Sequence, residues 1–170
     1  MNKKTSLISQ FNATFFALLL IFVLILPAQS VFGKRPPEIR NQEELNISSD
    51  MSGQDLSGND FVKLDLKGID FSESNLTGAV FNNSKLNNAD FHGAQLNDSL
   101  AYATDFEGAD LRDVDFTGAL LMESTFTNAL IEGADFTDAV ISRIQQKELC
   151  SIASGTNSRT NESTTYSLGC

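Results

Sequence analysis

Large apolar residues recur every five positions along most of this 170-residue chain. Every phenylalanine after residue 32 falls in one register of this count, and leucine or isoleucine fills most of the remaining positions. A period of five is neither the 3.6 of an α-helix nor the 2 of a β-strand, so neither element places these side chains on one face. The pattern predicts an all-β solenoid that turns a corner every five residues. The expected inward core comprises Phe61, Leu66, Phe71, Leu76, Phe81, Leu86, Phe91, Leu96, Phe106, Leu111, Phe116, Leu121, Phe126, Ile131 and Phe136.

The positions around each of these centres follow the same period. Two residues before the centre, the fourteen sites from Ser74 to Ala139 hold eight alanines and four serines. Two residues after it, the eighteen sites from Gly53 to Asp138 hold eight glycines, three asparagines and three aspartates, which tolerate tight turns and positive φ. We therefore expect each repeat to direct one large and one small residue inward, to turn, and to face water with the rest. One repeat cannot bury its apolar face alone, so stability must come from stacked neighbours.

Several segments carry a recognisable motif, for example Ala-Asp-Phe-His-Gly from Ala89, Ala-Asp-Leu-Arg-Asp from Ala109 and Ser-Asn-Leu-Thr-Gly from Ser74. They resemble the A(D/N)LXX motif of the pentapeptide-repeat family, and the resemblance extends over residues 50–144. It implies a right-handed quadrilateral β-helix with four repeats per coil. The tail, with Leu149–Asn157 and Ser167–Cys170, resembles the C-terminal end of thylakoid-lumen members, which implies two short capping helices and a cysteine pairing that fits them.

A coil of four five-residue repeats places centres twenty residues apart in one column. Phenylalanines then occupy two opposite walls in the first half of the solenoid and the other two walls in the second half, with the switch near Ala101. We hypothesise that this keeps the packing volume of each layer nearly constant. Ala101 should leave a local deficit, for which Phe106 and Tyr102 are the candidate fillers.

The five-residue pattern ends near Ile144, and a helical pattern follows it. Ile144, Leu149 and Ile152 recur at roughly helical intervals, Ser142 is a suitable N-cap, and Gly155 is a candidate helix end. We therefore divide the chain into four parts. These are a secretory signal peptide (1–30), a tether (31–44), the repeat β-helix (45–144) and a C-terminal helical cap (145–170).

The signal-peptide prediction comes from the start of the chain. Lys3 and Lys4 precede an apolar run from Phe15 to Leu26, and small residues follow it. Cleavage is expected after Ser30, with Gly33 as the second choice; an uncleaved membrane anchor is the alternative. Export implies an oxidising compartment, so Cys150 and Cys170 are expected to form a disulfide. Two free thiols or a metal pair are the alternative, although two cysteines supply too few ligands for a site.

Charge narrows the classes of partner. After cleavage at Ser30 the chain keeps 10 Lys+Arg and 22 Asp+Glu, a net charge of −12. This balance disfavours nucleic-acid phosphate and anionic lipid, and it permits attraction to a basic protein surface. We expect no membrane insertion after cleavage, a monomer rather than a dimer, and a protein partner whose identity the residues do not reveal.

Candidate chemistry is sparse. The repeat carboxylates Asp65, Asp70, Asp90, Asp105, Asp110, Asp115 and Asp135 suit hydrogen bonds to turn backbone. His92 follows a centre and should face outward. We find no nucleophile–base set, metal-ligand spacing or phosphate loop, so the prediction is a non-enzymatic protein with no cofactor, catalytic residue or metal site.

Two functional hypotheses remain. The first is an exported scaffold, in the thylakoid lumen or periplasm, that binds another protein. The second follows from the resemblance and from charge, because residues 50–141 hold 4 Lys+Arg against 17 Asp+Glu. Cytoplasmic members of the family resemble duplex DNA in charge and width and bind DNA gyrase. The export signal and a tail unlike a dimerising cap argue against that hypothesis.

Overall fold

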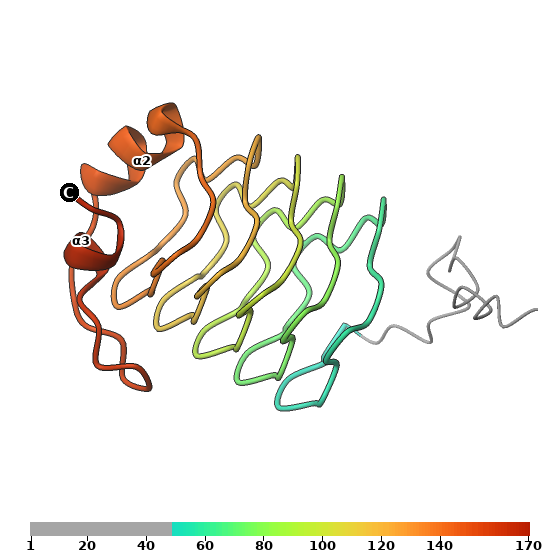
Figure 1. Ribbon diagram of the computed structural model, residues 1–170. Helices are drawn as coiled ribbons and strands as arrows, with labels where there is room; N and C mark the ends of the chain where they lie inside the picture. Colours follow the sequence, from blue (N-terminus) through green and yellow to red (C-terminus); the bar gives the residue numbers. More distant parts are fainter. Residues whose placement is uncertain (1–48) are drawn as a thin grey trace, which may run out of the picture. The chain divides into compact units, whose positions relative to one another are not determined.

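The computed structural model describes residues 49–170, which form a stack of similar coils followed by a C-terminal segment with two short helices (Figure 1). The predicted signal peptide, the tether and the predicted start of the repeats at residues 45–48 lie outside the described residues. None of the helices within 49–170 has the length and hydropathy needed to cross a membrane.

The coils have a period of twenty residues. Every β-bridge in the stack is parallel and joins a residue to the one twenty positions later, from Asp50–Asp70 at one end to Leu120–Val140 at the other. Each bridge is isolated, because the corner after every five residues leaves room for one bridged residue per wall. Residues 49–170 therefore contain no extended strand, although their backbone is paired from coil to coil as in a parallel sheet.

The bridged residues define four walls. Wall 1 has Asp60, Val80, Leu100, Leu120 and Val140; wall 2 has Asp65, Lys85, Asp105 and Thr125; wall 3 has Asp50, Asp70, Asp90, Asp110 and Leu130; wall 4 has Asp55, Asn75, Gln95, Asp115 and Asp135.

The same hydrogen bonds recur at each wall. The Phe61 N–H donates to the Val80 carbonyl at 2.7 Å, and the Val80 N–H donates back to Asn59 at 2.9 Å. At the corners, the position two after each centre has positive φ throughout, from Gly53 to Asp138. The glycine, asparagine and aspartate found there in the sequence are the residues that adopt this conformation at least cost.

The centres fill the inside of the stack. All fifteen predicted core residues are at most 7% exposed, and most of the phenylalanines are fully buried. Phe61 stacks on Phe81 with ring centroids 4.9 Å apart, and Phe106 stacks on Phe126 at 5.4 Å. Phenylalanines therefore do change walls at Ala101, and Phe91 contacts Phe106 edge-on at 5.9 Å across the change.

Tyr102 does not fill the space beside Ala101. Its side chain is 44% exposed, because the residue after a centre points outward. Phe106 is fully buried in the same region.

The C-terminal segment contains α2 (Arg143–Cys150) and α3 (Thr164–Ser167). Ser142 is the N-cap of α2, as predicted, and forms a capping box with Gln145. The prediction that the helix continues to Gly155 was wrong, because α2 ends at Cys150 with Ser151 as its C-cap. The three apolar residues of the helical pattern do not form one buried face. Leu149 is buried, but Ile144 and Ile152 are 73% and 50% exposed, and the polar Gln145 takes the second buried position.

Gly155 has a different role from the predicted helix end. Its φ is +83°, and a Cβ at this position would lie 2.8 Å from the backbone nitrogen of Gly133. The chain therefore needs glycine here because the tail passes directly over a corner of the last coil.

Candidate functional site

The interior of the stack is filled, so any functional surface must be built from outward side chains. Each wall exposes two columns of them, the bridged residue before each centre and the residue after it. The two columns differ from wall to wall.

Wall 3 carries a ladder of aspartates. Asp50, Asp70, Asp90 and Asp110 each accept a hydrogen bond from the backbone N–H two residues later, at 2.9–3.1 Å. These carboxylates hold the following turn, which is the structural role expected for them. The pKa of Asp110 is lowered, chiefly by the hydrogen bond from the Arg112 guanidinium, whose Nε lies 2.9 Å from Oδ1.

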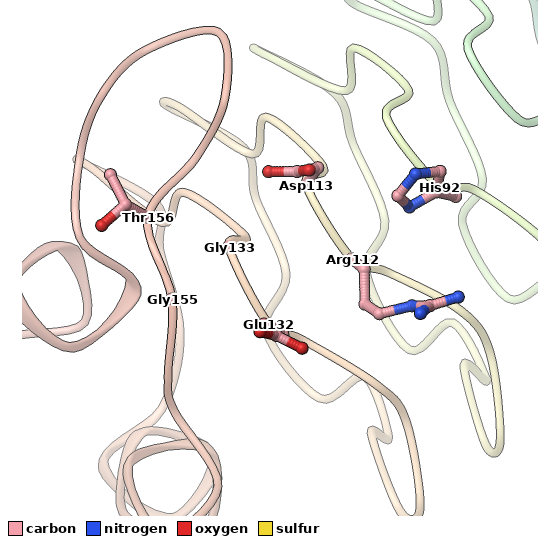
Figure 2. A pocket seen from close by; sticks show the side chains of 7 residues that line it. All are labelled: His92, Arg112, Asp113, Glu132, Gly133, Gly155 and Thr156. Atoms are coloured by element: carbon pink, nitrogen blue, oxygen red, sulfur yellow. The ribbon is translucent and has the colours of Figure 1, made fainter.

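A shallow hollow of about 210 Å³ lies between wall 3 and the tail (Figure 2). It is lined by His92, Arg112, Asp113, Glu132, Gly133, Gly155 and Thr156. His92 is half-buried rather than fully outward, and its Nδ1 atom is shielded without a hydrogen-bond partner. The tail fixes the rim, because the Ser158 N–H donates to Asp113 Oδ1 at 3.0 Å. Both charge signs meet here, and residues 49–170 contain no cluster of His, Cys, Asp and Glu suited to a metal ion.

Walls 2 and 4 are polar. On wall 4, Asn75 Nδ2 donates to Asp55 Oδ1 at 3.0 Å, and Thr77 Oγ1 donates to Asn97 Oδ1 at 2.9 Å, so side chains continue the coil-to-coil pairing. On wall 2, burial raises the pKa of Asp105, but hydrogen bonds from Thr125 and Asn87 outweigh it and the pKa is lowered overall. On both walls these polar side chains therefore bond to one another within the protein.

The bridged positions of wall 1 are apolar from the second coil onward, whereas the column after the centres still holds the polar Asn82 in that coil. The bridged residues are Val80, Leu100, Leu120 and Val140, and the column after the centres adds Tyr102 and Met122. Leu120, Val140, Tyr102 and Met122 are 41–44% exposed. The centres do not reveal this surface at a step of five or of twenty, because it is built from the residues beside them. Examining the residue before each centre in steps of twenty would have revealed it.

The C-terminal segment completes hydrogen bonds at the end of the stack. In the body, hydroxyls of one coil bond carbonyls of the coil before, as Thr104 Oγ1 does with Phe81 at 2.9 Å. Beyond the last coil, Gln145 Nε2 replaces such a hydroxyl as the donor. It donates to the carbonyls of Leu121 and Ser124 at 2.9 and 2.7 Å.

Two further side chains of the C-terminal segment form hydrogen bonds with backbone groups at other corners. Asn157, fully buried, donates through Nδ2 to the Gly133 carbonyl at 2.9 Å and to the Val114 carbonyl at 3.2 Å. Ser167 Oγ accepts from the Phe136 N–H at 3.0 Å. The Gly133 and Val114 carbonyls and the Phe136 N–H thereby gain hydrogen-bond partners, although no further coil follows to supply them.

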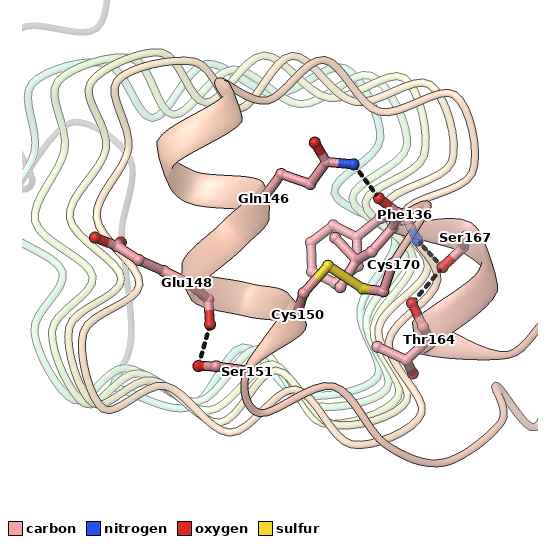
Figure 3. Close-up of a disulfide and its surroundings, with 9 residues drawn as sticks. Phe136, Gln146, Glu148, Cys150, Ser151, Thr164, Ser167 and Cys170 are labelled. Carbon is pink, nitrogen blue, oxygen red and sulfur yellow. Dashed lines mark hydrogen bonds between the residues drawn. A yellow bond between two sulfur atoms is a disulfide. The ribbon is translucent and has the colours of Figure 1, made fainter.

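Cys150 and Cys170 are joined by a disulfide, with their Cα atoms 5.6 Å apart (Figure 3). The bond ties the end of α2 to the last residue of the sequence. Gln146 Nε2 reinforces the connection by donating to the Leu168 carbonyl at 2.6 Å. The disulfide therefore links α2, which carries Gln145, to the residues that follow α3, the helix that carries Ser167.

Comparisons with known proteins agree on one family. Residues 65–100 and 102–141 match Pentapeptide repeats in eight copies. A pentapeptide repeat protein of the Arabidopsis thaliana thylakoid lumen is 36% identical over 70% of this chain and 90% of its own, with a TM-score of 0.29. No curated protein matches the chain.

Other solved structures are less similar in sequence. HetL, a pentapeptide repeat protein involved in heterocyst differentiation regulation in Nostoc sp. strain PCC 7120, is 22% identical over 57% of this chain and 43% of its own, with a TM-score of 0.39. QnrB1, a plasmid-mediated fluoroquinolone resistance protein, is 24% identical over 55% of this chain and 61% of its own, with a TM-score of 0.32. The chain thus spans less than two thirds of the length of both.

Proposed function

The chain belongs to the pentapeptide repeat family, and from this premise we propose that it is a non-enzymatic, exported scaffold that binds another protein. Family membership carries with it the right-handed sense of the quadrilateral coil. The thylakoid lumen or the periplasm is the proposed compartment, in line with the lumenal origin of the Arabidopsis relative.

One observation carries the proposal: the inside of the stack is closed and the four walls differ. Fully buried centres such as Phe71 and Leu96 leave no interior space for a substrate. Outward residues touch the core little, so a wall can carry a binding surface without loss of the fold. A protein with four unlike flat walls is suited to binding by surface complementarity rather than to chemistry.

We further propose that the C-terminal segment is a cap. Gln145, Asn157 and Ser167 supply bonds that a following coil would make. A terminal repeat with a polar outer face is what a solenoid needs to avoid end-to-end association. The Cys150–Cys170 disulfide holds this cap in place, and its persistence requires the oxidising compartment that the predicted signal peptide would supply.

Crosslinking mass spectrometry in the native compartment tests the scaffold function. The expected result is a reproducible set of crosslinks to one partner protein, with recovery in a pull-down that weakens as salt increases. Recovery of the chain without any crosslinked protein would refute the scaffold function.

A second candidate is favoured by charge alone, since residues 50–141 carry 17 acidic against 4 basic residues. On this candidate the solenoid mimics DNA and binds gyrase. The uncharged outward positions of wall 1 fit it poorly, because a duplex is charged along its whole length. Supercoiling by gyrase with and without the mature protein decides between the two: inhibition supports the mimic, and unchanged supercoiling removes it.

A further inference from the structure

Building on the proposed scaffold function, we infer that wall 1 is the docking surface, and that it takes a basic amphipathic helix of the partner protein. The surface is defined by Val80, Leu100, Leu120, Val140, Tyr102 and Met122. No other wall presents uncharged, apolar side chains at four successive bridged positions.

The geometry of the stack makes this surface continuous. Bridged residues sit directly above one another, so Val80 to Val140 form a row of three steps of about 4.8 Å, or ~14 Å. Asn82, Tyr102 and Met122 form a second, parallel row across the centres, in which Asn82 is polar and its Oδ1 accepts from the Tyr102 backbone N–H at 2.9 Å. The exposed side chains are held by a rigid core, because Phe81, Ala101 and Leu121 between the rows are fully buried.

The length of the row suits a helix. A helix of about ten residues spans ~15 Å, and its apolar residues recur every turn of about 5.4 Å, close to the spacing of the rungs. Laid along the wall, such a helix would place aliphatic side chains between the two rows, in the way that amphipathic helices dock in apolar grooves.

The corners beside wall 1 fix the charge of the partner. Asp98 and Asp138 occupy the corner toward wall 4, and Glu123 occupies the corner toward wall 2. Lys63 is the one basic residue at these corner positions, and it lies in the first coil, below Val80. The other corners beside this row, Gly78, Gly118, Asn83 and Ala103, are uncharged. Lysine or arginine on the docked helix would therefore meet a carboxylate at three of the seven corners and no cation at any of them.

The same charges argue against a second copy of this chain. An isologous dimer through wall 1 would bring acidic corners of both copies together. The patch is also small, since four of its six side chains are only 41–44% exposed and the other two less, whereas a standard interface buries about 800 Å² per partner.

The test uses the folded mature protein and a labelled synthetic helix of about twelve residues, with a leucine row flanked by lysines. Anisotropy should show saturable binding that weakens with salt. The variant Leu120→Ser/Met122→Ser should weaken binding about tenfold, as loss of central interface residues does. Leu130→Ser is the matched control, because Leu130 is a bridged leucine on wall 3 with 51% exposure, and it should leave binding within about twofold.

Three outcomes would overturn the inference. The first is equal binding of a peptide with glutamates in place of lysines. The second is equal weakening by the wall 1 and wall 3 variants. The third is sedimentation showing that the protein dimerises and that Leu120→Ser/Met122→Ser abolishes the dimer. None of these touches the scaffold proposal, which fails only when native crosslinking finds no partner protein.

Discussion

The stack and the C-terminal segment stabilise the same core by different means. Within the stack one local arrangement is repeated. Each coil offers the next coil the same backbone and hydroxyl groups for hydrogen bonding. In the C-terminal segment each contact occurs once, and side chains such as Gln145 and Asn157 replace backbone or hydroxyl groups of an absent coil. The comparison teaches that a repeat is encoded by its period, whereas its end is encoded by individual residues.

The largest effect is expected inside the stack. Phe81→Ala removes a fully buried ring that stacks on Phe61 and contacts Phe71 and Phe91 edge-on. It should lower the free energy of unfolding by about 3–5 kcal/mol, as for other buried aromatic truncations. Denaturant unfolding gives the value.

An outward substitution in the same stack provides the control. Thr127→Lys lies on the exposed face of wall 2 and should change the unfolding free energy by less than about 0.5 kcal/mol. Equal losses for the two variants would contradict the inward assignment of the five-residue centres.

Reduction of the disulfide should have the next largest effect, and it should act on the C-terminal segment first. Opening the twenty-residue loop between Cys150 and Cys170 costs about 3 kcal/mol on the chain-entropy model. Hydrogen exchange under reductant should lose protection in α2 and α3 before the stack. Unchanged melting in reductant would show that the bond does not support this segment.

The third prediction concerns the junction of the two regions. Gln145→Ala leaves the buried carbonyls of Leu121 and Ser124 without their side-chain donor. Such a loss costs about 1–3 kcal/mol. Lys147→Ala, exposed on the same helix, is the control and should be nearly neutral. Thermal unfolding of both variants measures the difference, and similar midpoints would mean that Gln145 does not seal the stack.

The smallest effect is expected from pH. The pKa of Asp110 lies below its ordinary value of 3.8, mainly because Arg112 donates to the carboxylate. A lowered carboxyl pKa stabilises the fold above 3.8, and this contribution is lost as pH falls through the folded-state pKa. Asp110→Asn should therefore show a shallower loss of melting temperature below about pH 4 than the wild type. Parallel pH profiles would exclude this contribution.

The repeats themselves were predictable because a single rule places every residue. The large centre, the small residue before it and the positive-φ position after it each recur every five residues. The pattern therefore remains recognisable despite single exceptions such as Ala101. The exchange of phenylalanines between walls followed from counting in twenties, and ring pairs such as Phe71 with Phe91 lie as that count requires.

The surface and the end of the molecule were less predictable, for physical reasons. Ile144 and Ile152 follow helical spacing and yet are exposed, because the end of the stack presents carbonyls that need a donor, and the buried position goes to Gln145. The apolar character of wall 1 was missed because most outward positions along the sequence are polar and the apolar ones are scattered among them. They become a surface only when the twenty-residue stacking brings them together.

The twenty-residue register underlies the core, the walls and the proposed docking surface, and engineered disulfides test it most directly. Parallel neighbours lie about 4.8 Å apart, within the 4.4–6.8 Å range of Cα separations for disulfides. Val80→Cys with Leu100→Cys, one above the other on wall 1, should therefore oxidise to a crosslink that mass spectrometry identifies. Val80→Cys with Gln95→Cys, on adjacent walls, should not. A crosslink between positions 80 and 95, or none between 80 and 100, would contradict this account.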